Sequence, residues 1–171
     1  KIEKKENILK KSEIVLQVDL PEEKNLEFFQ EKKILIGNFN SSQNLEKINK
    51  FKSKKTYIFS LELLPRITRA QSMDILSSQA NLAGYKAVLD SFSKFEKAVP
   101  MMMTAAGTIS AAKVLVVGAG VAGLQAIATA KRMGAIVFAT DVRMASKEQV
   151  ESLGGKFLVV EGSENLETEG G

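Results

Sequence analysis

The sequence contains no cysteine and no histidine among its 171 residues. Without cysteine, the chain can form no disulfide bridge, no thiolate zinc site and no thiol nucleophile. Without histidine, it lacks Ser-His and Cys-His catalytic arrangements and general acid–base catalysis by imidazole. We therefore expect no metal site. Any chemistry has to come from carboxylates, lysine, tyrosine, serine, threonine or a bound cofactor.

The excess of positive charge lies in the first third of the chain. Residues 1–56 carry 13 lysines and 9 acidic residues, an excess as large as the net charge of +4 of the whole chain. A basic face of this kind would suit a polyanion, but lysines that alternate with glutamates are typical of solvated helix surfaces. Aromatic residues that could stack on bases are not interleaved with the lysines, so we expect no nucleic-acid partner.

No segment is predicted to enter a membrane. The first residues are charged and lack the apolar core of a secretory signal. Residues 114–130 form an uncharged run of 17, close to a membrane-spanning length. This run begins with β-branched residues, contains three glycines and ends rich in alanine, which favours a strand followed by a buried helix.

The first third of the chain alternates short apolar runs with polar segments. The apolar runs predict strands at 13–18, 33–37 and 56–61. Pro21 followed by acidic residues predicts a helix over 21–29, and Ser41 or Ser42 is expected to cap a second helix that ends by residue 55. Strand–helix alternation at this spacing is typical of a parallel sheet.

The middle and the last third predict a long helix and a second parallel sheet. A loop over 62–69 leads into a helix over 72–97, which Pro100 is expected to stop and whose small residues imply close packing against another backbone. After an apolar stretch, strands are predicted at 113–117, 135–140 and 156–160. Helices are predicted at 124–133 and at 146–153, the latter capped by Ser146. The polar tail 161–171 shows no packing pattern.

A glycine-rich sequence joins the predicted strand at 113–117 to the next helix. Gly118, Gly120 and Gly123 form a G-x-G-x-x-G pattern, in which the first glycine permits a tight turn and the third lets the helix pack close to the strand. The second glycine leaves room for a pyrophosphate, which the amides and partial positive charge of the helix N-terminus would bind. The pattern predicts a dinucleotide site.

Asp141 follows Gly118 by 23 residues, at the end of the next predicted strand. A carboxylate at this position can accept hydrogen bonds from the adenosine ribose and repels a 2′-phosphate, which favours NAD over NADP. Arg143 argues the other way, because an arginine nearby can accommodate that phosphate. A unit that binds FAD or another nucleotide, or binds none, is the alternative.

A second group of polar residues lies at 66–78, with Arg66 and Arg69 in the loop. Gln71, Asp74 and Ser77 are spaced three apart and are expected on one side of the helix start. Such donors and acceptors would suit a nicotinamide amide. The structural alternative is that Asp74 only stabilises the helix dipole and Ser72 only caps the helix.

Four runs of the sequence resemble the NAD(H)-binding component of proton-translocating nicotinamide nucleotide transhydrogenases. This component is the alpha subunit of the bacterial enzyme and belongs to the alanine dehydrogenase/transhydrogenase family. The runs are RITRAQSMDILSSQANLAGYKAV, PMMMTAAGT, KVLVVGAGVAGLQAIATAKRMGAIVFATDVR and KEQVESLGGKF. The resemblance is close over 56–160 and weaker over 1–55, where mainly the order of strands and helices agrees.

The resemblance implies a fold and an activity. It implies two Rossmann-like parallel-sheet domains of the α/β class, joined by a long helix, in a component that binds NAD(H) and pairs with a copy of itself. This component would pass hydride directly to NADP⁺ on an NADP(H)-binding partner component, coupled to proton translocation through a membrane component. It would lie on the cytoplasmic face of the bacterial inner membrane, or on the matrix side of a mitochondrial membrane, held there by its partners.

The resemblance also assigns roles to residues of this sequence. Arg66, Gln71 and Asp74 would position the nicotinamide, with Ser77 beside them. The pyrophosphate turn would comprise Gly118, Gly120, Val121, Ala122 and Gly123. The adenosine ribose would meet Asp141, Val142 and Arg143, with Asp141 rather than Arg143 selecting the coenzyme.

Against that family, the chain is expected to be a fragment of two domains, cut at both ends and inactive alone. The predicted parts are a first α/β domain, a linking helix, a connector and the first half of the NAD-binding domain, over residues 1–69, 70–97, 98–112 and 113–171. Two alternatives stay open. One is an amino-acid dehydrogenase such as alanine dehydrogenase, which the lack of histidine disfavours. The other is a non-catalytic NAD-binding module.

Overall fold

The computed structural model describes residues 2–29 and 31–159. The chain divides into two compact units, Lys1–Leu76 and Ser77–Gly171, each with its own sheet and hydrophobic core. Both three-stranded sheets are parallel, which confirms the predicted α/β class. Within the described residues, no helix is both long enough and apolar enough to cross a membrane.

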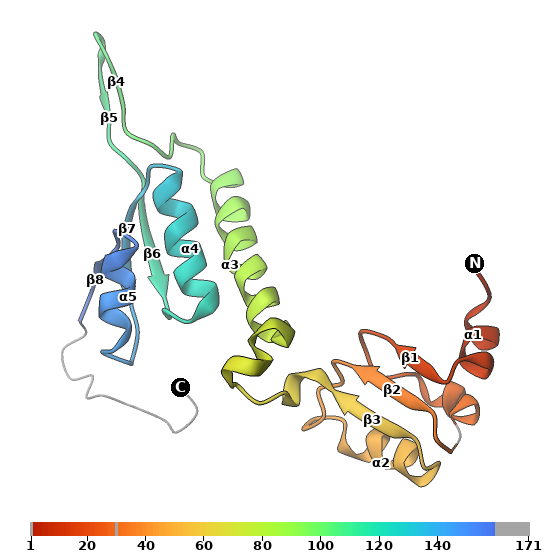
Figure 1. The fold of residues 1–171 in the computed structure, drawn as a ribbon. Helices are drawn as coiled ribbons and strands as arrows, with labels where there is room; N and C mark the ends of the chain where they lie inside the picture. Colours follow the sequence, from red (N-terminus) through yellow and green to blue (C-terminus); the bar gives the residue numbers. More distant parts are fainter. Residues whose placement is uncertain (1, 30, 160–171) are drawn as a thin grey trace. The chain divides into compact units, whose positions relative to one another are not determined.

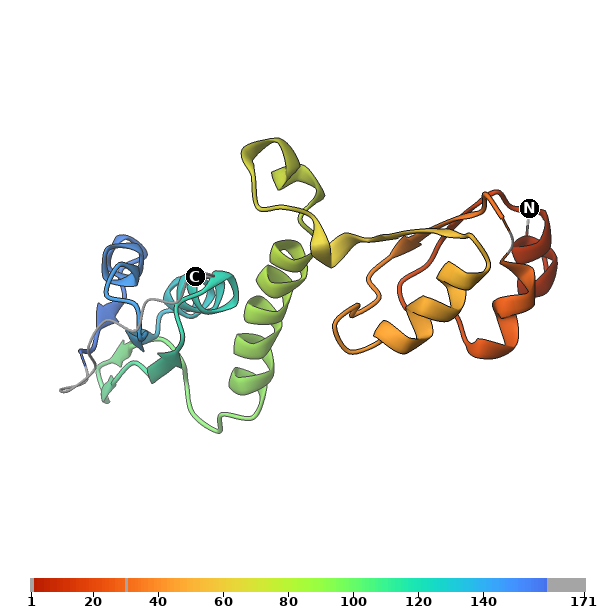
Figure 2. The same ribbon diagram turned by 90° about the horizontal axis from the view of Figure 1, so that it is seen from below.

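The first unit is a three-stranded parallel sheet with helices on one side. The strands β1 (Ile14–Leu16), β2 (Ile34–Gly37) and β3 (Tyr57–Ser60) lie in the order β1-β2-β3. The helices are α1 (Lys5–Lys11), which the sequence did not predict, and α2 (Leu45–Ser53). Figure 2 shows α2 on one side of the strands.

The core of the first unit forms because alternate strand residues face the helices. Val15 and Leu35 are buried with residues from the helices and loops, namely Leu9, Phe29, Phe39 and Phe51. The rings of Phe29 and Phe51 meet edge to face with their centroids 5.1 Å apart. Side chains that point to the opposite face of the sheet are exposed, among them Ile14, Leu16, Tyr57 and Phe59.

Two helix predictions in the first unit need correction. The segment predicted as an α-helix over 21–29 is a 3-10 helix, Glu23–Phe28. The helix α2 has Asn44 at its N-cap position, not Ser41 or Ser42. The reason is a contact that is remote in sequence: the amide and hydroxyl of Ser41 donate to the carboxylate of Glu62, so the loop continues past Ser41 before the helix starts.

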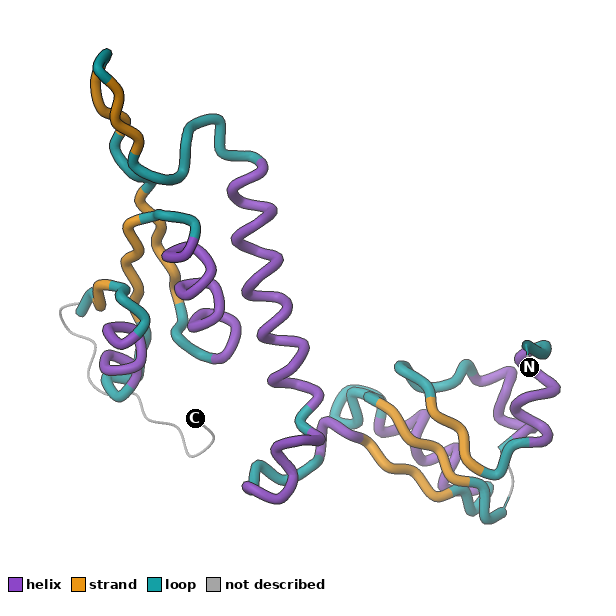
Figure 3. Tube along the Cα trace, turned by 45° about the horizontal axis from the view of Figure 1, so that its top comes forward, coloured by secondary structure: helices purple, strands orange, loops and turns teal. Residues whose placement is uncertain are grey.

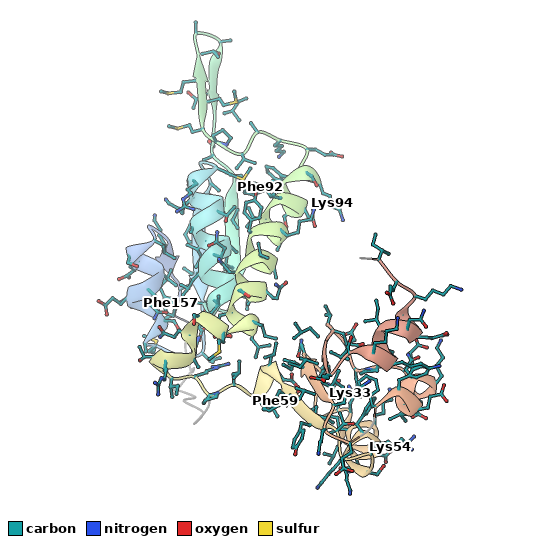
Figure 4. All side chains as sticks on the ribbon, turned by 45° about the vertical axis from the view of Figure 1, so that its right-hand side comes forward. Lys33, Lys54, Phe59, Phe92, Lys94 and Phe157 are labelled. Carbon is teal, nitrogen blue, oxygen red and sulfur yellow. The ribbon has the colours of Figure 1, made fainter. Side chains whose placement is uncertain are left out.

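The second unit holds the sheet β6-β7-β8, which comprises β6 (Lys113–Val117), β7 (Ile136–Thr140) and β8 (Lys156–Phe157). Its helices are α4 (Val121–Arg132) and α5 (Ser146–Ser152), and most of α3 (Ile75–Ser93) also belongs to it. The core contains Ile127, Val137 and Val150, all fully buried. Phe92 on α3 and Phe157 on β8 pack against this core (Figure 4).

The helices α3 and α4 pack with almost no space between their backbones. A Cβ added at Gly84 of α3 would lie 2.0 Å from the carbonyl oxygen of Ala122 in α4. Figure 1 shows α4 between α3 and strand β6. The prediction that the small residues of the long helix permit a close backbone approach is therefore confirmed.

The long helix is shorter than predicted at both ends. It begins at Ile75 because Asp74 has an extended backbone, and it ends at Ser93, well before Pro100. The hydroxyls of Ser91 and Ser93 donate to carbonyls of the last turn. Hydrogen bonds between residues three apart then close the helix end. Pro100 is therefore not the residue that stops the helix.

The segment predicted as a connector over 98–112 contains an antiparallel hairpin. Its strands are β4 (Met102–Thr104) and β5 (Gly107–Ile109), with Thr104 opposite Gly107. The hairpin projects from the second unit in Figures 1 and 3. Its apolar side chains are exposed, with Met103 at 72%.

The second half of this unit differs from the prediction only at element ends. Ser146 is the first residue of α5 and is buried, while Ala145 occupies the N-cap position and makes no capping hydrogen bond with its side chain. The predicted cap at Ser146 is therefore wrong. The strand β8 ends at Phe157, whereas the prediction extended it to residue 160. The polar tail 161–171 lies outside the described residues.

Candidate nucleotide-binding site

The glycine-rich sequence forms a tight turn between β6 and α4. Gly118 has a φ of +94°, a backbone conformation that favours glycine, and its amide donates to the carbonyl of Thr140 on β7 at 2.8 Å. Gly120 is the N-cap residue of α4, and the first bond within the helix runs from Leu124 to its carbonyl. The amides of the first helical turn therefore point out of the turn without partners inside the helix.

The three glycines of the turn differ in what surrounds them. A Cβ at Gly123 would lie 1.8 Å from the carbonyl oxygen of Gly118, so the helix and the turn are in direct backbone contact there. A Cβ at Gly120 would meet no atom within 4 Å. Open space beside Gly120, next to free helix amides and the positive end of the helix dipole, has the chemistry that a phosphate requires. Val121 and Ala122 supply two of these amides.

Asp141 follows β7 and reaches back to the turn. Its Oδ2 accepts a hydrogen bond from the amide of Ala119 at 2.6 Å, and its Oδ1 accepts one from the amide of Arg143 at 2.8 Å. The Arg143 side chain adds contacts from Nε to Oδ1 at 3.1 Å and from an Nη to Oδ2 at 3.5 Å. The structure thus brings together the turn, Asp141 and Arg143.

Asp141 is ionised at neutral pH. Burial alone would raise the pKa of this carboxyl, but the hydrogen bonds from the side chain and amide of Arg143 and from the amide of Ala119 outweigh it. Together they lower the pKa of Asp141 from 3.8 to about 2. Val142, between Asp141 and Arg143, is exposed.

The second group of predicted residues does not form one helix face. Gln71 lies in a 3-10 helix, Thr68–Met73, and Asp74 is extended, so only Ser77 lies on α3. The prediction failed because the extended backbone of Asp74 separates the 3-10 helix from α3. Arg66 and Gln71 are exposed, while Asp74 and Ser77 are half-buried. The residues 66–74 belong to the first unit, and Ser77 begins the second.

Glu62 organises the chain just before this group, and sequence reasoning missed it. Its Oε2 accepts from the amide of Phe39 at 3.1 Å, and its Oε1 accepts from the amide and hydroxyl of Ser41 and the hydroxyl of Ser60, at 2.8, 2.9 and 2.7 Å. Burial raises the pKa of Glu62, but hydrogen bonds from the amide and hydroxyl of Ser41, the hydroxyl of Ser60 and the amide of Glu62 itself outweigh it and lower the pKa to about 2. The one sequence signal is a glutamate two residues after a parallel strand.

No metal site is apparent in the part of the chain that the structure describes. Residues 2–29 and 31–159 contain no group of three or more acidic side chains placed to hold a metal ion. The donors around the turn are amides and the acceptor is one carboxylate, which is a set for phosphates and hydroxyls.

Two domain models of one family match nearly the whole chain. Residues 1–83 match the N-terminal domain, and residues 87–169 the C-terminal domain, of alanine dehydrogenase/PNT. The chain belongs to the alanine dehydrogenase/PNT family, as the sequence resemblance predicted.

Individual relatives agree with this assignment. The chain is 59% identical over 140 residues to an NAD(P) transhydrogenase subunit alpha protein of Rhodospirillum rubrum, covering 81% of this chain and 36% of that protein. The crystal structure of transhydrogenase from Sinorhizobium meliloti is 52% identical, with a TM-score of 0.85, covering 92% of this chain and 45% of that one. The chain therefore spans less than half the length of these relatives.

An L-alanine dehydrogenase structure is similar in fold, with a TM-score of 0.74 at 16% identity. The similarity covers 94% of this chain and 45% of that one. At this identity the likeness extends to the Rossmann-like fold and carries no argument about activity.

Proposed function

We propose that this chain binds NAD(H) and passes hydride directly to NADP⁺ held on a partner component, coupled to proton translocation across a membrane. The observation that carries the proposal is the turn Gly118–Gly123 with the ionised carboxylate of Asp141 hydrogen-bonded beside it. The high identity to proteins named NAD(P) transhydrogenase subunit alpha supports the same function.

The residues of the second unit fit the adenosine half of NAD(H). The open space at Gly120 and the first amides of α4 would hold the pyrophosphate. Asp141 would accept hydrogen bonds from the ribose hydroxyls, and its negative charge disfavours the extra phosphate of NADP(H). Val142 and Arg143 border the same position. These contacts bind and orient the coenzyme at a distance from the reacting ring.

The residues of the first unit would position the nicotinamide. Arg66, Gln71 and Asp74 offer a guanidinium, an amide and a carboxylate within one short segment, with Ser77 close in sequence. The coenzyme supplies the hydride, so no side chain has to donate or remove a proton. Position and polarity are what the protein contributes. A chain without histidine and cysteine can therefore support this chemistry.

The proposal includes partners and a location. The NADP(H)-binding and membrane components would be separate parts of the assembly, and the chain would pair with a copy of itself. The exposed apolar side chains of the hairpin, Met102, Met103 and Ile109, offer one surface for such pairing. The assembly would hold the chain on the cytoplasmic face of a bacterial inner membrane, or on the matrix side in mitochondria. We expect the segment alone to be inactive.

Direct hydride transfer between two coenzymes tests the proposal. The full-length protein is mixed with an NADP(H)-binding partner and with NADH deuterated at C4, and the NADPH product is analysed for deuterium. Deuterium in NADPH, and none in water, is the expected result. The matched control omits the partner, and transfer should then stop.

Two other outcomes would point elsewhere. Oxidation of NADH by pyruvate and ammonia without a partner would identify an amino-acid dehydrogenase. Binding of NADH with neither activity would identify a non-catalytic module.

A further inference from the structure

The carboxylate of Asp141 is almost fully enclosed by hydrogen-bond donors. Its side chain is 6% exposed, and each oxygen has one backbone donor and one donor from the Arg143 side chain. A carboxylate offers about four acceptor sites. All four are therefore in use before any nucleotide hydroxyl arrives.

The four donors differ in whether they can move away from the Asp141 carboxylate. The amides of Ala119 and Arg143 belong to the turn and to the chain just after β7, so they are fixed by the fold. The guanidinium of Arg143 is held only by its flexible side chain, which is 33% exposed. One of its two contacts, at 3.5 Å, is at the limit of a hydrogen bond.

A ribose diol presents the same pair of adjacent hydrogen-bond donors as the guanidinium of Arg143. The 2′ and 3′ hydroxyls are two adjacent donors, one for each carboxylate oxygen, as are the Nε and Nη groups of Arg143. The two sets of donors have to use the same acceptor sites, because the backbone amides occupy the others.

We propose that Arg143 is a specificity-determining residue that occupies the ribose-binding edge of Asp141 and has to leave when the ribose diol binds. The proposal rests on the proposed function, since it needs Asp141 to be the ribose acceptor. A ligand without a ribose diol cannot replace both contacts of Arg143. The arginine thereby selects for ligands that present two hydroxyls.

The competition predicts that loss of Arg143 strengthens binding. A partly exposed, forked ion pair contributes on the order of 1 kcal/mol, which corresponds to about fivefold in an equilibrium constant. Since the ribose diol can pair with Asp141 only when the Arg143 side chain has moved away, the apparent affinity for NADH is reduced by the fraction of protein in that state. We expect Arg143→Ala to bind NADH about fivefold more tightly, with the gain in the association rate constant and little change in dissociation.

The test measures NADH association and dissociation by stopped-flow fluorescence with the full-length protein at physiological salt. Arg132→Ala is the matched control, because it removes the same charge from the exposed end of α4. Arg143→Lys keeps the charge but loses the paired guanidinium donors, and we expect an intermediate gain in NADH affinity. The Lys variant also serves if the Ala variant fails to fold.

A second ligand distinguishes displacement of the Arg143 side chain by the ribose diol from a general effect of the substitution on the fold. An NADH analogue without the 2′ and 3′ hydroxyls of the adenosine ribose should bind the wild type and Arg143→Ala within twofold of each other. Equal or weaker NADH binding by Arg143→Ala, or an equal gain for the analogue, overturns the inference and leaves the proposed function standing. A wild-type protein that binds no NADH overturns both.

Discussion

Glu62 should be the most pH-sensitive structural contact in the first unit. Its carboxylate accepts four hydrogen bonds from Phe39, Ser41 and Ser60, donors that come from the loop after β2 and from the end of β3. The substitution Glu62→Gln removes the charge and turns one acceptor oxygen into an amide group that faces donors. The loop after β2 would then lose its attachment to the end of β3.

The magnitude follows from the pKa of Glu62. A carboxyl with an ordinary pKa of 4.5 that is lowered to about 2 in the folded protein contributes about 3 kcal/mol when ionised, at 1.36 kcal/mol per pKa unit. Because the folded pKa is depressed, this stability is fully present above pH 4.5 and is lost as the pH falls from 4.5 through about 2. At pH 3, roughly 1 kcal/mol should remain.

Amide hydrogen exchange is the suitable assay, because it reports opening of one loop in a chain with two units. Exchange at Phe39 and Ser41 is compared between Glu62→Gln and the wild type at equal pH. The variant should open more readily by about 3 kcal/mol at neutral pH and by roughly 1 kcal/mol at pH 3. Glu46→Gln, an exposed carboxylate on α2, is the matched control and should change neither amide.

Two results would refute this reasoning. One is equal protection in Glu62→Gln and the wild type at neutral pH, which would mean that the four hydrogen bonds contribute nothing net. The other is a difference that stays constant down to pH 2, which would mean that the charge of Glu62 does not matter.

Three further predictions concern packing and the coenzyme site. Gly84→Ala places a Cβ against the carbonyl of Ala122 and should destabilise the second unit by about 1–3 kcal/mol in chemical denaturation. Gly120→Ala should leave the stability unchanged and weaken NADH binding at least tenfold by calorimetry. Equal stability of the two variants would contradict the close contact between α3 and α4. Asp141→Asn should weaken NADH binding and reduce the preference of the protein for NADH over NADPH. An unchanged ratio of the two dissociation constants would show that Asp141 does not select the coenzyme. Gln71→Asn should slow single-turnover hydride transfer more than it weakens binding, and an unaffected rate would exclude it from positioning the ring.

The sequence predicted the second sheet well because its signal is local. The apolar, valine-rich run at 113–117 coincides with β6, and Gly118 turns the chain where the pattern placed the turn. An apolar parallel strand and a glycine-rich turn are specified by adjacent residues, so no distant contact is needed to find them. The position of Asp141 was predicted for the same reason, since it directly follows the next strand, β7.

The errors occur where a distant contact decides the local structure. Ser41 has the residue type of a helix cap, but its amide and hydroxyl donate to Glu62, which lies in the 3-10 helix Leu61–Leu63. Ser146 matches a capping pattern, yet it is the buried first residue of α5, and Ala145 takes the N-cap position. The extended backbone of Asp74 separates Gln71 from Ser77 on α3, which helical spacing would have kept on one face. The sequence predicts that Arg143 contacts nucleotide, and only the structure reveals its pairing with Asp141.

The hydrogen bond from Ala119 to Asp141 constrains how coenzyme preference can evolve or be redesigned. A protein that accepts NADP has to give up the negative charge at this position. In this chain the same carboxylate also holds the glycine-rich turn through the amide of Ala119, so alanine or glycine at residue 141 would remove this contact as well as the negative charge. A change of preference has to pass through a neutral side chain that still accepts a hydrogen bond, such as asparagine. A substitution at residue 141 therefore affects the coenzyme preference and the shape of the turn together.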